Sequence, residues 1–137
     1  SGPGLVLLYE SIARCDGVVH ELLSPEQITK IALSKSNASA EEAVAMLCGI
    51  LGSVAGNLAL TLGARGGVFV GGGIVPKLGK YFDSSPFRTR FESKGRFSKY
   101  VSEIPTCVIS SKYPALIGAA VAVKKHYGYL GATSVSS

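Results

Sequence analysis

The chain has 137 residues, of which 47% are hydrophobic and 17% are charged, a balance that excludes a disordered segment and suffices for one domain with a core. Three cysteines at wide spacings and two histidines argue against a disulfide scaffold and against a zinc site, and suit a reducing cytoplasm. The net charge of +5 lies in the stretch Lys77–Tyr100, because the remaining acidic and basic residues cancel.

The first half of the chain predicts three helices. Leu5–Arg14 carries apolar residues at helical spacing. Ser24–Gln27 predicts the start of a second helix, which extends to about Lys35. Serine is suited to the N-cap position, proline suits the first turn, and glutamine can close a capping box with the serine. A similar box at Ser39–Glu42 predicts a third helix, and Gly63 suits its left-handed end.

The third helix is apolar enough to raise the question of a membrane. Ala43–Ala64 holds 22 uncharged residues, the length of a bilayer span, with two glycines spaced as in membrane helix pairs. Every fourth position along one face is nevertheless polar (Ser53, Asn57 and Thr61), and no basic cluster or aromatic belt marks either end. Three glycines without side chains would also let neighbouring elements pack close to the backbone of this helix (Gly49, Gly52 and Gly56). We therefore predict a buried core helix and no membrane partner.

The second half predicts two short strands among helices. The strands are expected at Gly67–Val70 and Thr106–Ser110. Helices are expected after Pro76 to about Phe82, from Ser85, over Phe97–Ser102 and, with a face of small residues, over Pro114–Tyr127. The Gly/Ser-rich residues 131–137 are expected to form a flexible tail. This alternation predicts the α/β class, mostly helical, with residues 1–130 as one unit.

The basic stretch Lys77–Tyr100 contains seven basic and two acidic residues, and aromatic residues interleave with them (Phe82, Phe87, Phe91, Phe97 and Tyr100). Such a pattern is typical of nucleic-acid surfaces, where cations meet phosphates and rings stack on bases. The spacing of the aromatic residues fits burial on short amphipathic helices better. We expect no nucleic-acid partner, and a non-enzymatic basic module remains the alternative.

A run of three glycines, Gly71–Gly73, directly follows the first predicted strand. Glycines at that place let a ligand approach the backbone, and a helix after them offers N–H groups to an anion. The dinucleotide fingerprint fails because Pro76 stands where it needs glycine, and no P-loop motif is present. The run is either a ligand-binding loop or a tight strand-to-helix turn.

Five ordered motifs resemble a known family: Ser1–Leu5, Gly56–Leu60, Gly66–Pro76, Phe91–Phe97 and Pro114–Gly118. On these motifs the chain resembles the C-terminal part of a bacterial-type glucokinase, of the hexokinase and actin-like ATPase superfamily, over nearly all its length except the tail. The resemblance implies the C-terminal portion of a ribonuclease H-like lobe, whose last helix reaches towards the small lobe. It also implies a cytoplasmic parent enzyme that phosphorylates glucose with ATP and Mg²⁺ in glycolysis.

The resemblance places cofactor-binding residues but no catalytic or metal-binding ones. Gly71, Gly72 and Gly73 match the family's adenosine motif, and Ser1 and Gly2 match a turn whose following helix lies near the nucleotide. The family's phosphate loops, catalytic base and sugar-binding motif would all precede Ser1. The isolated chain is therefore expected to be an inactive fragment.

Two expectations and one alternative remain from the resemblance. A fragment of this kind exposes apolar surface, so we expect it to form a homodimer or to bind the missing N-terminal half of the same protein. The alternative parent is a related sugar kinase or a sugar-sensing repressor. The absence of the Cys-rich zinc loop common among such repressors and their kinase relatives favours glucokinase.

Overall fold

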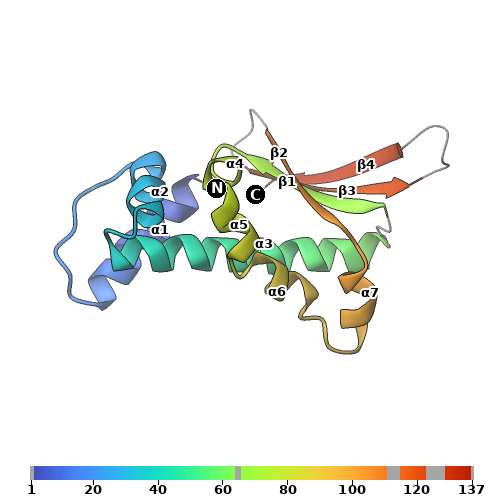
Figure 1. The fold of residues 1–137 in the computed structure, drawn as a ribbon, viewed down its shortest axis with the longest axis horizontal. Helices are drawn as coiled ribbons and strands as arrows, with labels where there is room; N and C mark the ends of the chain where they lie inside the picture. Colours follow the sequence, from blue (N-terminus) through green and yellow to red (C-terminus); the bar gives the residue numbers. More distant parts are fainter. Residues whose placement is uncertain (1, 64–65, 111–114, 123–128, 137) are drawn as a thin grey trace.

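The structure is a computed structural model that describes residues 2–63, 66–110, 115–122 and 129–136 (Figure 1). Its helices are α1 (Gly2–Cys15), α2 (Pro25–Leu33), α3 (Ala38–Leu62), α4 (Val75–Leu78), α5 (Lys80–Ser84), α6 (Phe87–Glu92), the 3₁₀ turn η1 (Gly95–Phe97) and α7 (Ser98–Ser102). Its strands are β1 (Gly67–Gly72), β2 (Thr106–Ser110), β3 (Ala115–Ala122) and β4 (Tyr129–Ser136). The alternation of helices with the β1–β2 pair confirms the predicted α/β class.

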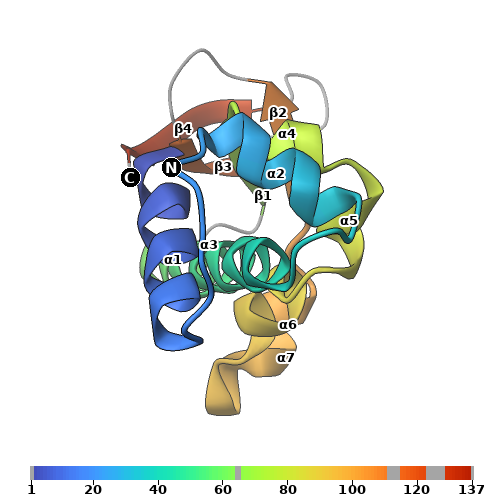
Figure 2. The ribbon, with the colours of Figure 1, turned by 90° about the vertical axis from the view of Figure 1, so that its left-hand side faces the viewer.

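The 25-residue helix α3 forms the centre of the molecule. The sheet lies on one side of it and α6 on another, and α1 and α2 pack near its N-terminal end (Figures 1 and 2). An 18-residue window of α3 has a mean hydropathy of 1.9, enough for a membrane span by composition, yet 56% of that window is buried inside the protein. The helix packs as the predicted core helix.

Local capping chemistry sets the bounds of the long helices. Ser24 and Gln27 form the predicted capping box, in which the Gln27 N–H donates to Ser24 Oγ and the Ser24 N–H donates to Gln27 Oε1. Gly63 ends α3 with φ of 60°, as predicted. The predicted cap at Ser39 is wrong, because the Asn37 side chain accepts from the Ala40 N–H and α3 begins before Ser39.

The four strands form one sheet in the order β2-β1-β3-β4. Strand β1 pairs in parallel with β2, and its opposite edge pairs antiparallel with β3, which in turn pairs antiparallel with β4. The two strands of the parallel pair are the two that the sequence predicted, at Gly67–Val70 and Thr106–Ser110. Because β1 is central, its backbone N–H and C=O groups have strand neighbours on both sides.

The predicted last helix and flexible tail are wrong for the described residues. Strand β3 occupies residues 115–122 of the predicted helix Pro114–Tyr127, and β4 occupies residues 129–136 of the predicted tail and the segment before it. Residue 114 and residues 123–127 of that prediction lie outside the described residues. Residues 115–122 form a strand because of a partner far away in the sequence. As a strand they supply a ladder of hydrogen bonds to the second edge of β1, which a helix could not do.

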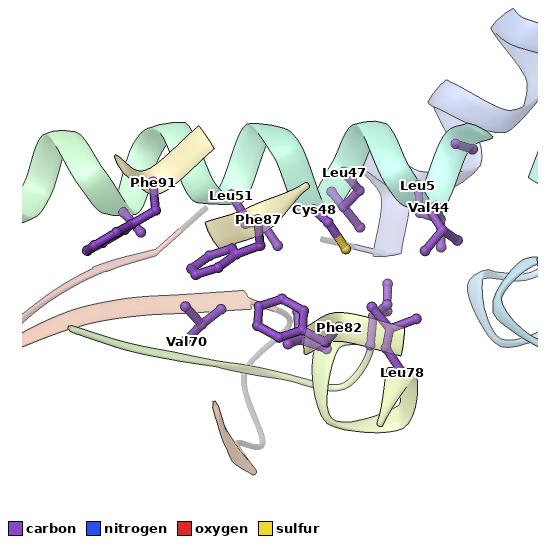
Figure 3. Packing of buried hydrophobic residues seen from close by; sticks show 14 of the residues in the cluster. Leu5, Val44, Leu47, Cys48, Leu51, Val70, Leu78, Phe82, Phe87 and Phe91 are labelled. Atoms are coloured by element: carbon purple, nitrogen blue, oxygen red, sulfur yellow. The ribbon is translucent and has the colours of Figure 1, made fainter. Parts of the chain in front are cut away.

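The aromatic residues of the basic stretch fill the core beneath α3. Phe87 and Phe91 of α6 and Phe82 of α5 are buried between α3 and β1 (Figure 3), and the rings of Phe82 and Phe87 lie 4.7 Å apart. These rings have no face left for stacking on bases, as the amphipathic interpretation predicts. The nucleic-acid hypothesis thus loses its stacking surface at these three positions.

The cations of the same stretch attach α6 to the polar face of α3. The Lys94 Nζ donates to Ser53 O at 3.0 Å and to Asn57 Oδ1 at 2.8 Å, and the Arg90 Nε donates to Ser53 Oγ at 3.1 Å. Burial lowers the pKa of Lys94, and the charge of Arg90 lowers it further. Two residues of the predicted polar stripe on α3 therefore serve as acceptors for cations of the α6 segment.

A buried thiol makes the fold sensitive to alkaline pH. Burial raises the pKa of Cys48 above its ordinary value of 9.0, against a smaller opposing effect of its hydrogen bond with Ser85. Since the folded thiol ionises later than the unfolded one, its contribution to stability is complete below pH 9 and is lost as the pH rises through the folded pKa.

We therefore expect the free energy of unfolding of the chain to fall as the pH rises above about 9. Cys48→Ala is expected to flatten that decline, because it removes the buried ionising group. Urea unfolding at several pH values between 8 and 10.5 measures the effect, with Cys15→Ala as the control, because Cys15 is exposed. An alkaline decline that Cys48→Ala leaves unchanged would assign the sensitivity to other groups.

Candidate nucleotide-binding edge

The three glycines predicted to bind a cofactor lie at the carboxyl end of β1. Gly71 and Gly72 are buried inside the sheet, and Gly72 pairs with Ser110 of β2 and Ala115 of β3. Gly72 has φ of 142°, a backbone conformation that side chains rarely adopt. Gly73 is exposed, and a Cβ built on it would meet no atom of the described residues within 4 Å. Among the residues that the structure describes, the sheet therefore ends in backbone that no side chain covers.

The segment after the glycines fixes this open backbone in place. Ile74 precedes α4, whose first turn contains Pro76, and Val75 and Leu78 are buried. Helix α4 packs against both β1 and β2. Gly79 has φ of 57° and separates α4 from α5, where a single helix was predicted. Because α4 has only four residues, its N-terminus offers little of the dipole that would attract an anion.

The other predicted cofactor-binding pair is not brought to the same place. Gly2 opens α1 and lies against α2, since a Cβ on Gly2 would come within 3.1 Å of Pro25 Cγ. Ser1 lies outside the described residues. The start of α1 and helix α4 overlap in Figure 1 but lie apart in Figure 2. The three glycines Gly71–Gly73 thus lie together at the end of β1, and Gly2 lies elsewhere in the described part of the chain.

The described part of the chain offers little for acid–base or metal chemistry. Within residues 2–63, 66–110, 115–122 and 129–136, no group of three His, Cys, Asp or Glu residues could hold a metal ion. Asp16 and Asp83 are both exposed, one after α1 and one in α5. His20 Nδ1 lies 3.3 Å from Val18 O, and its ring meets that of Tyr9 edge-on. The described residues at the carboxyl end of β1 therefore offer backbone to a ligand but no acid–base or metal-binding group.

A positioning residue that the sequence interpretation missed is Arg88 on α6. Its Nη1 donates to Ile104 O and its Nη2 to Ser102 O, each at 2.9 Å, and its Nε contacts Glu92 at 2.6 Å. These bonds fix the segment that leads into β2 and hence the strand beside β1. The available signal was the spacing of Arg88 and Glu92, which places them on one helix face.

Comparison with known proteins gives one family. Residues 1–126 match the family described as Glucokinase. The chain is 54% identical over 123 residues to a glucokinase of Aromatoleum aromaticum, covering 90% of this chain and 37% of that protein. It is 51% identical over 126 residues to a glucokinase of Chromobacterium violaceum, covering 92% of this chain and 36% of that protein.

A solved structure gives the same result for the fold. The crystal structure of a glucokinase from an Antarctic psychrotroph matches this chain with a TM-score of 0.72 and 37% sequence identity. The match covers 81% of this chain and 35% of that protein. This likeness confirms the predicted fold class, a portion of an actin-like ATPase lobe. The chain spans less than two fifths of the length of the relatives it matches.

Proposed function

The chain belongs to the glucokinase family, and we propose that the polypeptide containing it transfers the γ-phosphoryl group of ATP to glucose. In this proposal the described chain contributes contacts to the adenosine side of the nucleotide. The remaining length, which corresponds to almost two thirds of each relative, contributes the phosphate-binding, catalytic and sugar-binding groups. Phosphoryl transfer depends on positioned metal, phosphate ligands and a base.

The observation that carries this proposal is the open backbone at Gly73. A flat ring can lie against a main chain only where no side chain intervenes, and the space around Gly73 meets that condition. The two glycines before it let β1 run unobstructed between β2 and β3 up to this point. We assign Mg²⁺ no ligand among the described residues, since they contain no suitable cluster, and propose that it reaches the site with the ATP phosphates.

The cysteines support a cytoplasmic setting for this enzyme. Cys15, Cys48 and Cys107 are all free thiols, and Cys15 and Cys107 are exposed. Exposed free thiols persist in a reducing compartment. We therefore propose that the enzyme acts in glycolysis in the cytoplasm.

The glycine site is tested by adding a side chain at its exposed residue. Gly73→Val in the natural-length polypeptide is expected to raise the KM for ATP about tenfold or more and to leave the KM for glucose nearly unchanged. The side chain would enter the space that the nucleotide needs, while the folded chain has room for it. Steady-state kinetics with each substrate varied in turn measures both constants.

Two comparisons keep this test specific. Gly73→Ala is expected to give a smaller rise in the KM for ATP, because its side chain is smaller. Thermal unfolding of both variants is expected to match that of the parent polypeptide. Gly72→Val is also expected to raise the KM for ATP, but it forces a side chain onto φ of 142° and so also strains the fold. Equal losses for ATP and glucose with Gly73→Val would show that the glycines form a structural turn only.

A further inference from the structure

The side chain of Lys94 is held in one orientation on the core helix α3. It comes from the short segment between α6 and η1 and crosses Gly56, where a Cβ would come within 2.5 Å of Lys94 Cε. The Lys94 Nζ donates to Ser53 O at 3.0 Å and to Asn57 Oδ1 at 2.8 Å. Lys94 is half-buried and Asn57 is exposed, so a small reagent in solution reaches the amine. Most surface lysines sample many rotamers, whereas this one has a fixed amine.

The two hydrogen bonds of Lys94 suit the uncharged amine as well as the ammonium. An ammonium has three N–H donors, and loss of one proton leaves two donors and a lone pair. The two remaining donors match the two acceptors on α3, so the lone pair is directed away from them. Burial and the charge of Arg90 lower the pKa of Lys94. At a given pH its reactive, uncharged form is therefore more populated than that of an ordinary lysine.

A second cation lies beside this amine, and no carboxylate neutralises it. The Arg90 Nε donates to Ser53 Oγ at 3.1 Å, so Arg90 and Lys94 bind the same serine. Glu92, the carboxylate nearest in sequence, is paired with Arg88. In the described part of the chain neither Arg90 nor Lys94 forms an ion pair, and the two terminal nitrogens of Arg90 donate to no acceptor. A guanidinium in this state suits a phosphate group, which accepts two parallel hydrogen bonds from it.

We propose that Lys94 is a site of acylation by acyl phosphates, which carry an anionic phosphate group directly on the reactive carbonyl. The terminal nitrogens of Arg90 bind the phosphate of the donor, and the lone pair of Lys94 Nζ attacks the carbonyl carbon. A C–N bond forms, the C–O bond to phosphate breaks, and inorganic phosphate leaves with the electron pair. The nitrogen releases a proton to water, so the product is an uncharged amide.

Acylation of Lys94 weakens the attachment of the α6 segment to α3. The amide nitrogen retains one N–H, so it cannot donate to both Ser53 O and Asn57 Oδ1 as the amine does. The charge that strengthens both hydrogen bonds is also lost. The inference uses surface groups of α3 and of the segment around α6. It therefore does not rest on the phosphoryl transfer proposed above, and its test needs no turnover.

Peptide mass spectrometry of the natural-length polypeptide treated with acetyl phosphate tests the proposal. Lys94 is expected to be acetylated about fivefold faster or more than Lys80 and Lys99, because its amine is less protonated and lies beside a phosphate ligand. Lys80 and Lys99 are exposed and serve as controls within the same molecule. In concentrated urea, where the fold is lost, the three lysines are expected to react at similar rates.

Two arginine variants separate phosphate binding from the basicity of the amine. Acetic anhydride is an uncharged donor and reports the reactivity of the amine alone. Arg90→Gln is expected to slow the acetylation of Lys94 by acetyl phosphate about fivefold more than that by acetic anhydride. Arg96→Gln is the matched control, since Arg96 lies over the Phe97 ring, and it is expected to leave the ratio of the two rates unchanged. The proposal is overturned if Lys94 reacts with acetyl phosphate no faster than Lys80, or if Arg90→Gln slows both donors equally.

Discussion

Replacing Gly52 by alanine is expected to destabilise the chain by about 3 kcal/mol or more, even though alanine is the better helix former. A Cβ at this position would overlap Phe87 O and lie 2.9 Å from Phe87 C, so the backbone of α6 would have to move away from α3. Phe87 and Phe91 would then leave the positions in which they fill the space beneath α3 (Figure 3). Chemical unfolding monitored by circular dichroism measures the loss.

Gly49 provides a matched control on the same helix. A Cβ at Gly49 would lie 3.5 Å from Arg90 Nη1 and 3.8 Å from Pro86 Cβ, which are ordinary contacts. Gly49→Ala is therefore expected to stabilise the chain by roughly 0.5–1 kcal/mol through helix propensity alone. If Gly52→Ala were as stable as Gly49→Ala, the close contact between α3 and α6 would be contradicted.

The parts of the fold that follow from local chemistry could be predicted from the sequence. The capping box at Ser24 and the left-handed end at Gly63 depend on residues within one turn of each other, and both are found. The short strands β1 and β2 are apolar runs between turn-forming residues. The glycines of α3 indicated a close neighbour, and Gly52 and Gly56 have one in α6.

The C-terminal strands could not be predicted because their cause lies far away in the sequence. Residues 115–122 combine alanines, which favour a helix, with isoleucine and valine, which favour a strand. Whether this segment becomes a helix or a strand depends on the free edge of β1, almost 50 residues earlier in the chain. Strand β3 pairs with that edge along the whole length of β1. Helix propensity read along the segment contains no information about that edge.

The candidate site was predictable only in part for the same reason. A strand followed by Gly71–Gly73 indicates open backbone from local sequence alone, and the structure shows it. The assignment of Ser1 and Gly2 to the nucleotide came only from the resemblance to a family, and in the structure Gly2 lies against Pro25. Arg88 could not be assigned its role, because its two carbonyl acceptors lie 14 and 16 residues later in the chain, at the end of α7 and in the segment before β2.

The complete absence of turnover by the 137-residue chain alone is the other large effect that we expect. In the proposed function the backbone at Gly73 contacts the nucleotide, but it carries no base to deprotonate a sugar hydroxyl. The exposed carboxylates Asp16 and Asp83 have no metal-binding neighbours among the described residues. A polypeptide that also supplies the remaining length of the relatives has room for those groups.

Formation of glucose 6-phosphate from glucose and Mg-ATP, followed for both polypeptides at equal concentration, is the decisive measurement. The natural-length polypeptide is expected to form the product at a rate that depends on both substrates, and the 137-residue chain alone is expected to give no product above the enzyme-free background. Turnover by the chain alone would show that it holds a catalytic base of its own. Failure of the natural-length polypeptide to phosphorylate glucose would contradict the proposed function itself.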